Sequence, residues 1–188
     1  SGPPYEAGQS NDRGGALFDQ VLDQIYQAGR WLNGTDLHTS IRHLLQTVGW
    51  VSPTIQSIHI VCITLVIGTS ALLDLRILGW AAPSQVPAEM ARRLLPWTWS
   101  ALAVQFLTGG MLVLNRPIRY ADNPSFLFKM LFLIIGIVLT LVLASGLRRD
   151  PDHWSSTPAR VLTGKVLAGG SVLAWVLIVL AGRWIAYR

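Results

Sequence analysis

The sequence predicts an all-α integral membrane protein, an up-down four-helix bundle preceded by amphipathic helices. Charged residues make up 13% of the 188 residues and hydrophobic residues 51%, whereas a soluble domain usually carries about 25% charged residues. Four long apolar stretches contain at most one charged residue each: 54–73, 97–114, 126–147 and 161–182. The connections between them are short, which makes successive helices antiparallel neighbours. These observations exclude a disordered chain and argue against a soluble domain.

The charge and the cysteine content narrow the function classes. The formal net charge is +5, but the basic residues are scattered along the chain rather than gathered in a patch. We therefore expect membrane lipids and no nucleic acid as partners, because excess Arg in such a protein sets its topology. The single cysteine, Cys62, excludes a disulfide framework and a paired-cysteine metal site.

Residues 1–52 differ from the rest of the chain. Residues 1–15 are rich in Gly, Pro and polar side chains, which predicts a flexible tail. Residues 16–52 are predicted to form amphipathic helices, because apolar residues recur there at helical spacing. Such helices lie flat in the headgroup region of a membrane or dock to a partner subunit. The polar face is acidic, whereas membrane-surface helices usually have a basic one, so both interpretations stay open.

Residues 53–188 are predicted to form the transmembrane domain. The stretches lack the alternating pattern of membrane-barrel strands, and the stretch 131–143 lacks the polar face of a helix in a soluble bundle. A helix needs roughly 20 apolar residues to cross a bilayer. The expected spans cover about residues 54–78, 96–115, 126–148 and 158–183.

Capping residues mark where several helices begin. Asn123 and Thr157 each precede a proline, a pair typical of the N-cap and first position of a helix. Pro96 is expected to open the second span. In the connection before it, we expect a separate short helix over residues 87–95, capped by Ser84.

The arginines predict an orientation. Six lie in the first and third connections, and five lie on the opposite side of the bundle. By the positive-inside rule, the side that carries Asp74 faces the cytoplasm. Both termini are then expected on the periplasmic side of a bacterial cytoplasmic membrane.

Two ionisable side chains near one face of the bundle are candidate functional residues, because such groups inside a membrane span are costly. His59 lies about five residues into the first span and Lys129 about four residues into the third. These spans run parallel in an up-down bundle, so both side chains are expected at similar depth. The second and fourth spans end at this level, and we expect a cluster drawn from all four spans: His59, Lys129, Asn115, Arg116 and Arg183.

The cluster suits a tetrapyrrole cofactor such as haem b. The neutral imidazole of His59 would be the metal ligand, to haem iron or to the magnesium of a chlorophyll-type pigment. Lys129 and Arg183 would support the acidic groups of the ligand, beside Asn115 and Arg116. A quinone or an anionic headgroup is an alternative ligand. The non-functional interpretation is a hydrogen-bonded histidine beside Lys and Arg side chains that reach toward the membrane surface.

Other histidines are poor candidates for a second axial ligand. No other predicted span contains a histidine. His43 would reach the cluster only if its helix folds over the bundle, and His153 is expected on the opposite side.

The opposite end carries a second group of ionisable residues and shows no sign of catalysis. Asp74 closes the first span near Arg76, Arg92 and Arg93, and we expect structural ion pairs that hold the bundle together. The sequence contains no HExxH motif, no glycine-rich phosphate loop and no carboxylate pair inside a span. The balance is against an enzyme, although the sequence leaves the question open.

Several motifs carry a resemblance to known families. In chain order they are His59, DLRILG at 74–79, RLLPW at 93–97, Lys129 and GRWIAY at 182–187. Together they resemble an uncharacterised family of small bacterial four-helix membrane proteins, a domain of unknown function, over about residues 31–187. A His in the first span with a Lys early in the third also resembles the copper-resistance D family and the HemJ-type protoporphyrinogen oxidases. These resemblances imply haem or copper contact at His59 and Lys129.

Three functions are therefore expected as alternatives. The first is binding of a b-type haem or related tetrapyrrole through His59, with a role in electron transfer. The second is a non-catalytic accessory subunit of a larger membrane complex. The third is an oxidoreductase acting on a porphyrin or a quinone. Patches of small residues such as 168–171 allow close helix packing, within the chain, in self-association or with other subunits.

Overall fold

The computed structural model describes residues 13–121 and 123–185, with side chains placed for 20–121 and 123–183. Within these residues the chain is helical and has no strand, which confirms the predicted all-α class. The helices are α1 Arg13–Asn33, α2 Asp36–Thr47, α3 Val51–Leu78, α4 Pro87–Asn115, α5 Pro117–Ala121, α6 Pro124–Arg149 and α7 Pro158–Ile185.

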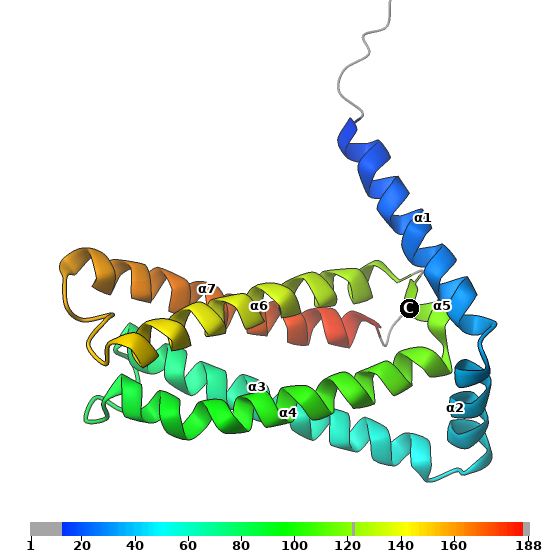
Figure 1. The fold of residues 1–188 in the computed structure, drawn as a ribbon, viewed down its shortest axis with the longest axis horizontal. Helices are drawn as coiled ribbons and strands as arrows, with labels where there is room; N and C mark the ends of the chain where they lie inside the picture. The colour runs from blue at the N-terminus through cyan, green and yellow to red at the C-terminus, as the bar shows by residue number, and fades with distance from the viewer. Residues whose placement is uncertain (1–12, 122, 186–188) are drawn as a thin grey trace, which may run out of the picture.

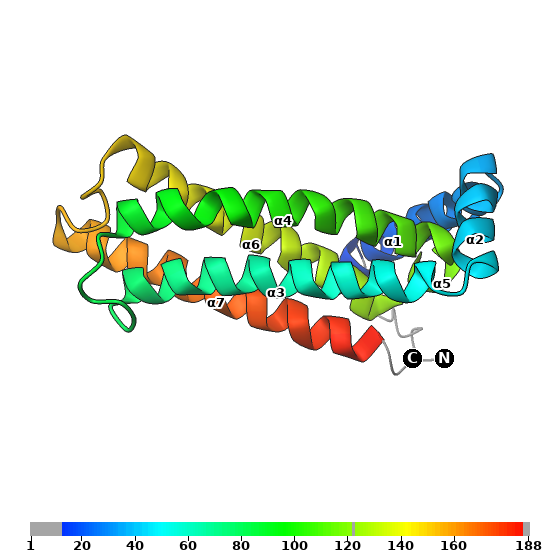
Figure 2. The same ribbon diagram turned by 90° about the horizontal axis from the view of Figure 1, so that it is seen from below.

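The long helices α3, α4, α6 and α7 lie side by side in two pairs (Figures 1 and 2). α3 packs along α4, α6 packs along α7, and the pairs are joined mainly where α3 packs against α7. Contacts between α4 and α6 are few. The bundle is therefore tight between α3 and α7 and looser between α4 and α6.

These four helices have the length and composition of helices that cross a membrane. The qualifying segments are Val51–Leu78, Pro87–Asn115, Pro124–Arg149 and Pro158–Arg183. They agree with the four apolar helices predicted from the sequence. Many of their large apolar side chains face outward, among them Leu107, Val61 and Ile134, each more than 60% exposed. Such an outer surface is suited to lipid rather than to water.

The start of α4 corrects one prediction. The expected short helix over 87–95 is not separate, because α4 continues through Pro96, and its N-cap residue is Val86 rather than Ser84. Proline lacks an N–H and leaves the carbonyl of Arg92 without its helical partner, but Arg92 is exposed. Buried positions continue at helical spacing on both sides of the proline, and this packing carries the helix through it: Ala88, Ala91, Leu95, Thr98, Ala101 and Leu102.

Two predicted helix starts are confirmed. At the start of α6, Asn123 Oδ1 accepts a hydrogen bond from the Ser125 N–H at 3.0 Å. At the start of α7, Thr157 Oγ1 accepts from the Arg160 N–H at 3.3 Å. Each cap satisfies a backbone donor that the first turn of a helix leaves without an internal partner.

The N-terminal helices lie at one end of the bundle. α2 crosses the ends of α3 and α4, and α1 extends away from the bundle (Figure 1). α1 already includes residues 13–15, which we predicted to be tail, and residues 1–12 lie outside the described residues. Gly29 brings α1 close to α5, since a Cβ at position 29 would lie 3.0 Å from the Ala121 Cβ.

At the opposite end, Trp154 in the α6–α7 connection packs into the helix pair. Its indole N–H donates to the Leu143 carbonyl at 3.1 Å. The ring lies so close to Gly146 that a Cβ there would be 2.7 Å from it. Deeper in the bundle, Gly136 faces the buried ring of Trp175, with a Cβ contact of 3.2 Å. These glycines serve contacts within the chain, one of the roles expected for small residues.

Candidate functional site

A cavity of about 500 Å³ lies where α4 and α6 diverge. Three polar side chains reach it from three different helices: His59 from α3, Gln105 from α4 and Lys129 from α6. Leu32 of α1 and Tyr120 of α5 also line it, so the cavity lies toward the end of the bundle that the N-terminal helices cover.

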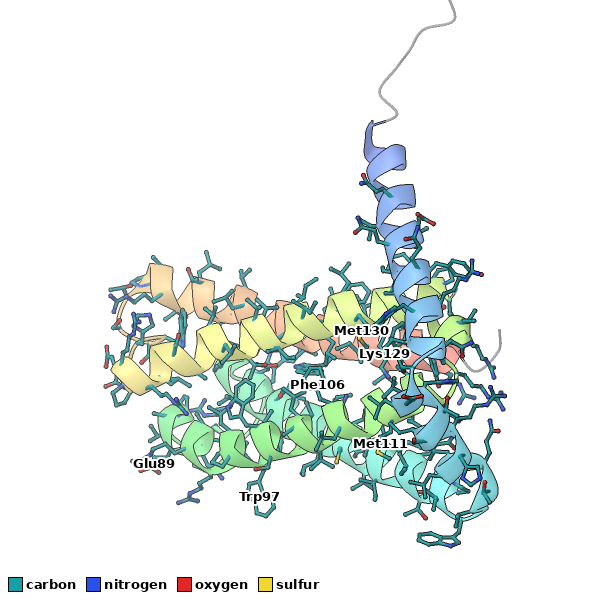
Figure 3. All side chains as sticks on the ribbon, turned by 45° about the vertical axis from the view of Figure 1, so that its right-hand side comes forward. Glu89, Trp97, Phe106, Met111, Lys129 and Met130 are labelled. Atoms are coloured by element: carbon teal, nitrogen blue, oxygen red, sulfur yellow. The ribbon has the colours of Figure 1, made fainter. Side chains whose placement is uncertain are left out.

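The remaining walls of the cavity are mainly apolar. Figure 3 shows Phe106, Met130 and Lys129 together between α4 and α6. In the same view, Glu89 and Trp97 lie toward the other end of α4. A concave, largely apolar space with a few convergent polar groups is the usual form of a small-molecule site. This one suits a ligand with a large apolar body and a polar edge.

His59 is held by a specific hydrogen bond. Its Nδ1 lies 2.9 Å from Thr108 Oγ1 on α4. The Thr108 hydroxyl is also placed to donate its one hydrogen to the Val104 carbonyl, at 2.8 Å. We therefore assign the proton of the imidazole to Nδ1, donating to Thr108. The Nε2 atom then carries a free lone pair.

Gly109 provides the space in which the His59 ring lies. A Cβ at position 109 would be 3.1 Å from the His59 Cε1 atom, closer than most real Cβ contacts. Thr108 and Gly109 thus act together on adjacent positions of α4, one orienting the ring and the other making room for it.

Gln105 and Lys129 bring two further polar groups to the cavity. The Gln105 side chain is 6% exposed, and its Oε1 atom has no hydrogen-bond partner among the described residues. Lys129 makes no hydrogen bond or ion pair with any residue that the structure describes. Among the described residues, no Asp or Glu lines the cavity, so none of them neutralises the lysine.

The structure brings together only part of the predicted cluster. His59 and Lys129 line the same cavity. Arg183 is exposed, and its neighbour Gly182 lines the cavity in its place. Asn115 and Arg116 lie outside the cavity, in a surface hollow of about 330 Å³ beside Arg42 and Arg119.

The sequence interpretation missed Gln105, Thr108 and Gly109. The signal was present, because Gln105 and Thr108 are polar residues three positions apart within an apolar stretch. That spacing places both on one face of a helix. Only the packing of α3 against α4 shows that this face meets His59.

The other histidines do not reach the cavity. His43 lines an exposed hollow on α2, and His38 is buried on α2 with neither ring nitrogen hydrogen-bonded. His153 lies in the α6–α7 connection, edge-on to Trp154. Among the described residues, no three His, Cys, Asp or Glu side chains gather as a metal site. A tetrapyrrole differs from a bare ion in this respect, because its ring supplies most of the ligands.

At the other end of the bundle, the predicted ion pairs of Asp74 are not formed. Asp74 is 2% exposed, whereas Arg92 and Arg93 are exposed. Arg76 donates instead to backbone carbonyls of the α3–α4 connection, to Gln85 at 2.6 Å and to Pro83 at 3.2 Å. The reason is helical geometry: residues two apart face different sides of a helix, so Asp74 points into the bundle and Arg76 away from it.

The chain belongs to a family of unknown function, DUF6644, whose model matches residues 37–188. This agrees with the uncharacterised family expected from the motifs. A search of curated proteins and a search of solved structures each found no match.

Proposed function

We propose that this chain is an integral membrane protein of the bacterial cytoplasmic membrane that binds a b-type haem or a related tetrapyrrole beside His59. In this proposal α3, α4, α6 and α7 cross the membrane as an up-down bundle. α1 and α2 lie at the periplasmic surface. The bound cofactor gives the protein a role in electron transfer.

The observation that carries the proposal is the hydrogen bond from His59 Nδ1 to Thr108 Oγ1 at 2.9 Å. Histidines that bind metals almost always donate their other ring N–H to a fixed acceptor, which orients the ring and keeps the ligating nitrogen deprotonated. Here that acceptor is itself fixed by its bond to the Val104 carbonyl. His59 Nε2 would therefore be the atom that binds the haem iron.

The other residues of the cavity fit the same kind of ligand. The Lys129 ammonium has no carboxylate partner among the described residues of the wall, and a propionate group would supply one. Phe106 and Met130 give the apolar surface that a macrocycle requires. In this proposal His59 binds the metal, Thr108 orients the His59 ring and Lys129 neutralises the propionate. The apolar walls exclude water. The haem itself supplies a one-electron redox centre.

A haem titration of the purified full-length protein in detergent tests this proposal. We expect a saturable Soret band and a loss of haem affinity of at least about tenfold in His59→Ala. The matched control is His43→Ala, an exposed histidine outside the cavity, which should bind as the parent does. Equal binding by the parent and His59→Ala would exclude His59 as the ligand. A quinone that copurifies in place of haem would favour the oxidoreductase alternative.

A second candidate function is an accessory subunit of a larger membrane complex. It is supported by α1, which extends from the bundle (Figure 1) and exposes Val21 and Trp31 to 52% and 71%. Deletion of residues 1–34 should then abolish copurification of partner subunits. A complex that stays intact after the deletion would reject docking through α1.

A further inference from the structure

The inference concerns Asp74, the carboxylate near the cytoplasmic end of α3, and it rests on the proposed membrane insertion. Asp74 is 2% exposed, and no ion pair joins it to a described residue. Its Oδ2 atom has no hydrogen-bond partner. A buried, ionised carboxylate with no cation beside it is strongly unfavourable in an apolar setting, so this group either holds a proton or pairs with a cation.

Two buried serines lie near the Asp74 carboxyl. Ser171 of α7 faces the Asp74 carboxyl, and yet Ser171 Oγ makes no hydrogen bond with it or with any other described group. Ser70 lies one helical turn before Asp74, on the same face of α3. Ser70 is 1% exposed and Ser171 0%, and Ser70 Oγ also lacks a partner.

Thr140 of α6 is a further candidate for the group. Gly136 of α6 touches the ring of Trp175 of α7. α6 and α7 run antiparallel, so one turn along each helix from that contact brings Thr140 and Ser171 to the same level. Thr140 is 3% exposed, and its hydroxyl has no partner. The Trp175 N–H, one turn from Ser171, is also unpartnered, but a donor does not coordinate a cation and we leave it outside the group.

Most other Ser and Thr hydroxyls that the structure describes in the long helices do have a partner. They bond back to the carbonyl about one turn earlier, the usual local arrangement. Thr64, Thr69, Thr98 and Thr163 all do so. Thr69 and Thr98 also bond each other at 2.8 Å across α3 and α4. Ser70, Thr140 and Ser171 make no such bond, so their oxygens remain available.

We propose that Asp74, Ser70, Thr140 and Ser171 form a binding site for a small monovalent cation, Na⁺, inside the bundle. The donors are one carboxylate and three hydroxyl oxygens, and oxygen ligands of this kind suit hard cations. One carboxylate balances one positive charge, so the occupied site is neutral. A divalent ion would leave a net charge buried in an apolar setting, which is costly.

Sodium binding by the full-length protein in detergent tests this site. Radioactive sodium is measured by equilibrium dialysis, and thermal unfolding is followed in NaCl and in choline chloride at equal ionic strength. We expect saturable sodium binding. We also expect the midpoint temperature of unfolding to rise with NaCl but not with choline chloride, because a ligand that binds only the folded state stabilises that state. No binding by the unmodified protein would overturn the proposal, whether or not any variant folds.

Single substitutions test which residues form the sodium site. Asp74→Asn should abolish sodium binding, and Ser171→Ala should weaken it at least about tenfold, the loss of one ligand. The matched controls are Glu89→Gln, an exposed carboxylate, and Ser145→Ala, an exposed hydroxyl bonded to its own helix. Both should bind sodium as the parent does. Undiminished binding in Asp74→Asn would also overturn the site.

Carbodiimide labelling separates sodium from a proton. Dicyclohexylcarbodiimide reacts with protonated carboxyl groups, and mass spectrometry reports its addition to Asp74. We expect NaCl to slow this labelling and choline chloride to leave it unchanged. Labelling that Na⁺ does not slow would show a site for protons alone and would contradict the proposal. The haem titration of Asp74→Asn should match the parent, so failure of one proposal is distinguishable from failure of the other.

Discussion

The two ends of this helical bundle place their ionisable side chains in different surroundings. Toward α1 and α5, where α4 and α6 diverge, His59 and Lys129 face a cavity of about 500 Å³. Toward the α6–α7 connection the helices close around glycine and tryptophan contacts, and Asp74 is 2% exposed. The spacing of the helices, rather than the type of residue, thus decides what each end can hold. The open end has room for a cofactor beside its ionisable residues. At the closed end a hollow of about 490 Å³ lies between α4 and the end of α6, and Asp74 does not line it.

The largest effect is expected where the closed end is packed. In Gly146→Ala the new Cβ would lie 2.7 Å from the Trp154 ring, and overpacking of this kind typically costs about 1–3 kcal/mol. In detergent, the variant should therefore unfold at a lower temperature, or at a lower denaturant concentration, than the parent protein. Gly169→Ala is the control, since nothing lies within 4 Å of its Cβ position. Equal stability of the two variants would mean that the closed end is not tightly packed.

The next effect is expected at the open end, in the orientation of His59. Thr108→Val removes the acceptor of the His59 N–H and should lower haem affinity about 10- to 100-fold, the usual loss when such a supporting residue is changed. Thr108→Ser retains the hydroxyl and should restore most of the affinity. The measurement is a haem titration followed by absorbance. A valine variant that binds as tightly as the parent would show that the ring needs no orientation.

Replacement of Lys129 should lower haem affinity without lowering the stability of the protein. Lys129→Met removes a charge that has no carboxylate partner among the described residues of the cavity wall, so the free energy of unfolding should not fall. The free energy of haem binding should weaken by about 1.5 kcal/mol, the lower end of the range for a hydrogen bond to a charged group. Parallel unfolding and haem titrations measure both quantities. A large loss of stability would instead show that the lysine is a structural residue.

The smallest effect is expected from the steric partner of His59. Gly109→Ala places a Cβ 3.1 Å from the imidazole, a contact that a shift of a few tenths of an ångström relieves. Haem affinity should fall by less than about tenfold, since the ring can move without losing its bond to Thr108. Gly110→Ala, with nothing within 4 Å, is the control. If both alanine variants bind equally, Gly109 does not position the ring.

The fold was largely predictable, and the site only in part. Apolar stretches long enough to cross a membrane identified the four long helices, and the caps at Asn123 and Thr157 marked two of their starts. The exception was Pro96. The local sequence predicts a helix start there, but α4 continues through the proline because buried residues on both sides of it pack against the bundle. His59 and Lys129 were found because ionisable residues stand out in apolar segments.

The sequence by itself determined the helical class, the four apolar helices and two residues of the cavity, because hydropathy and capping act over a few neighbouring residues. Only the tertiary structure decided which side chains meet. In the folded chain His59 lies beside Thr108, and Asn115 and Arg116 line another hollow. Asp74 faces into the bundle while Arg76 faces away from it. The physical reason is that each outcome depends on the rotation and spacing of helices far apart in the chain, and no local pattern records either.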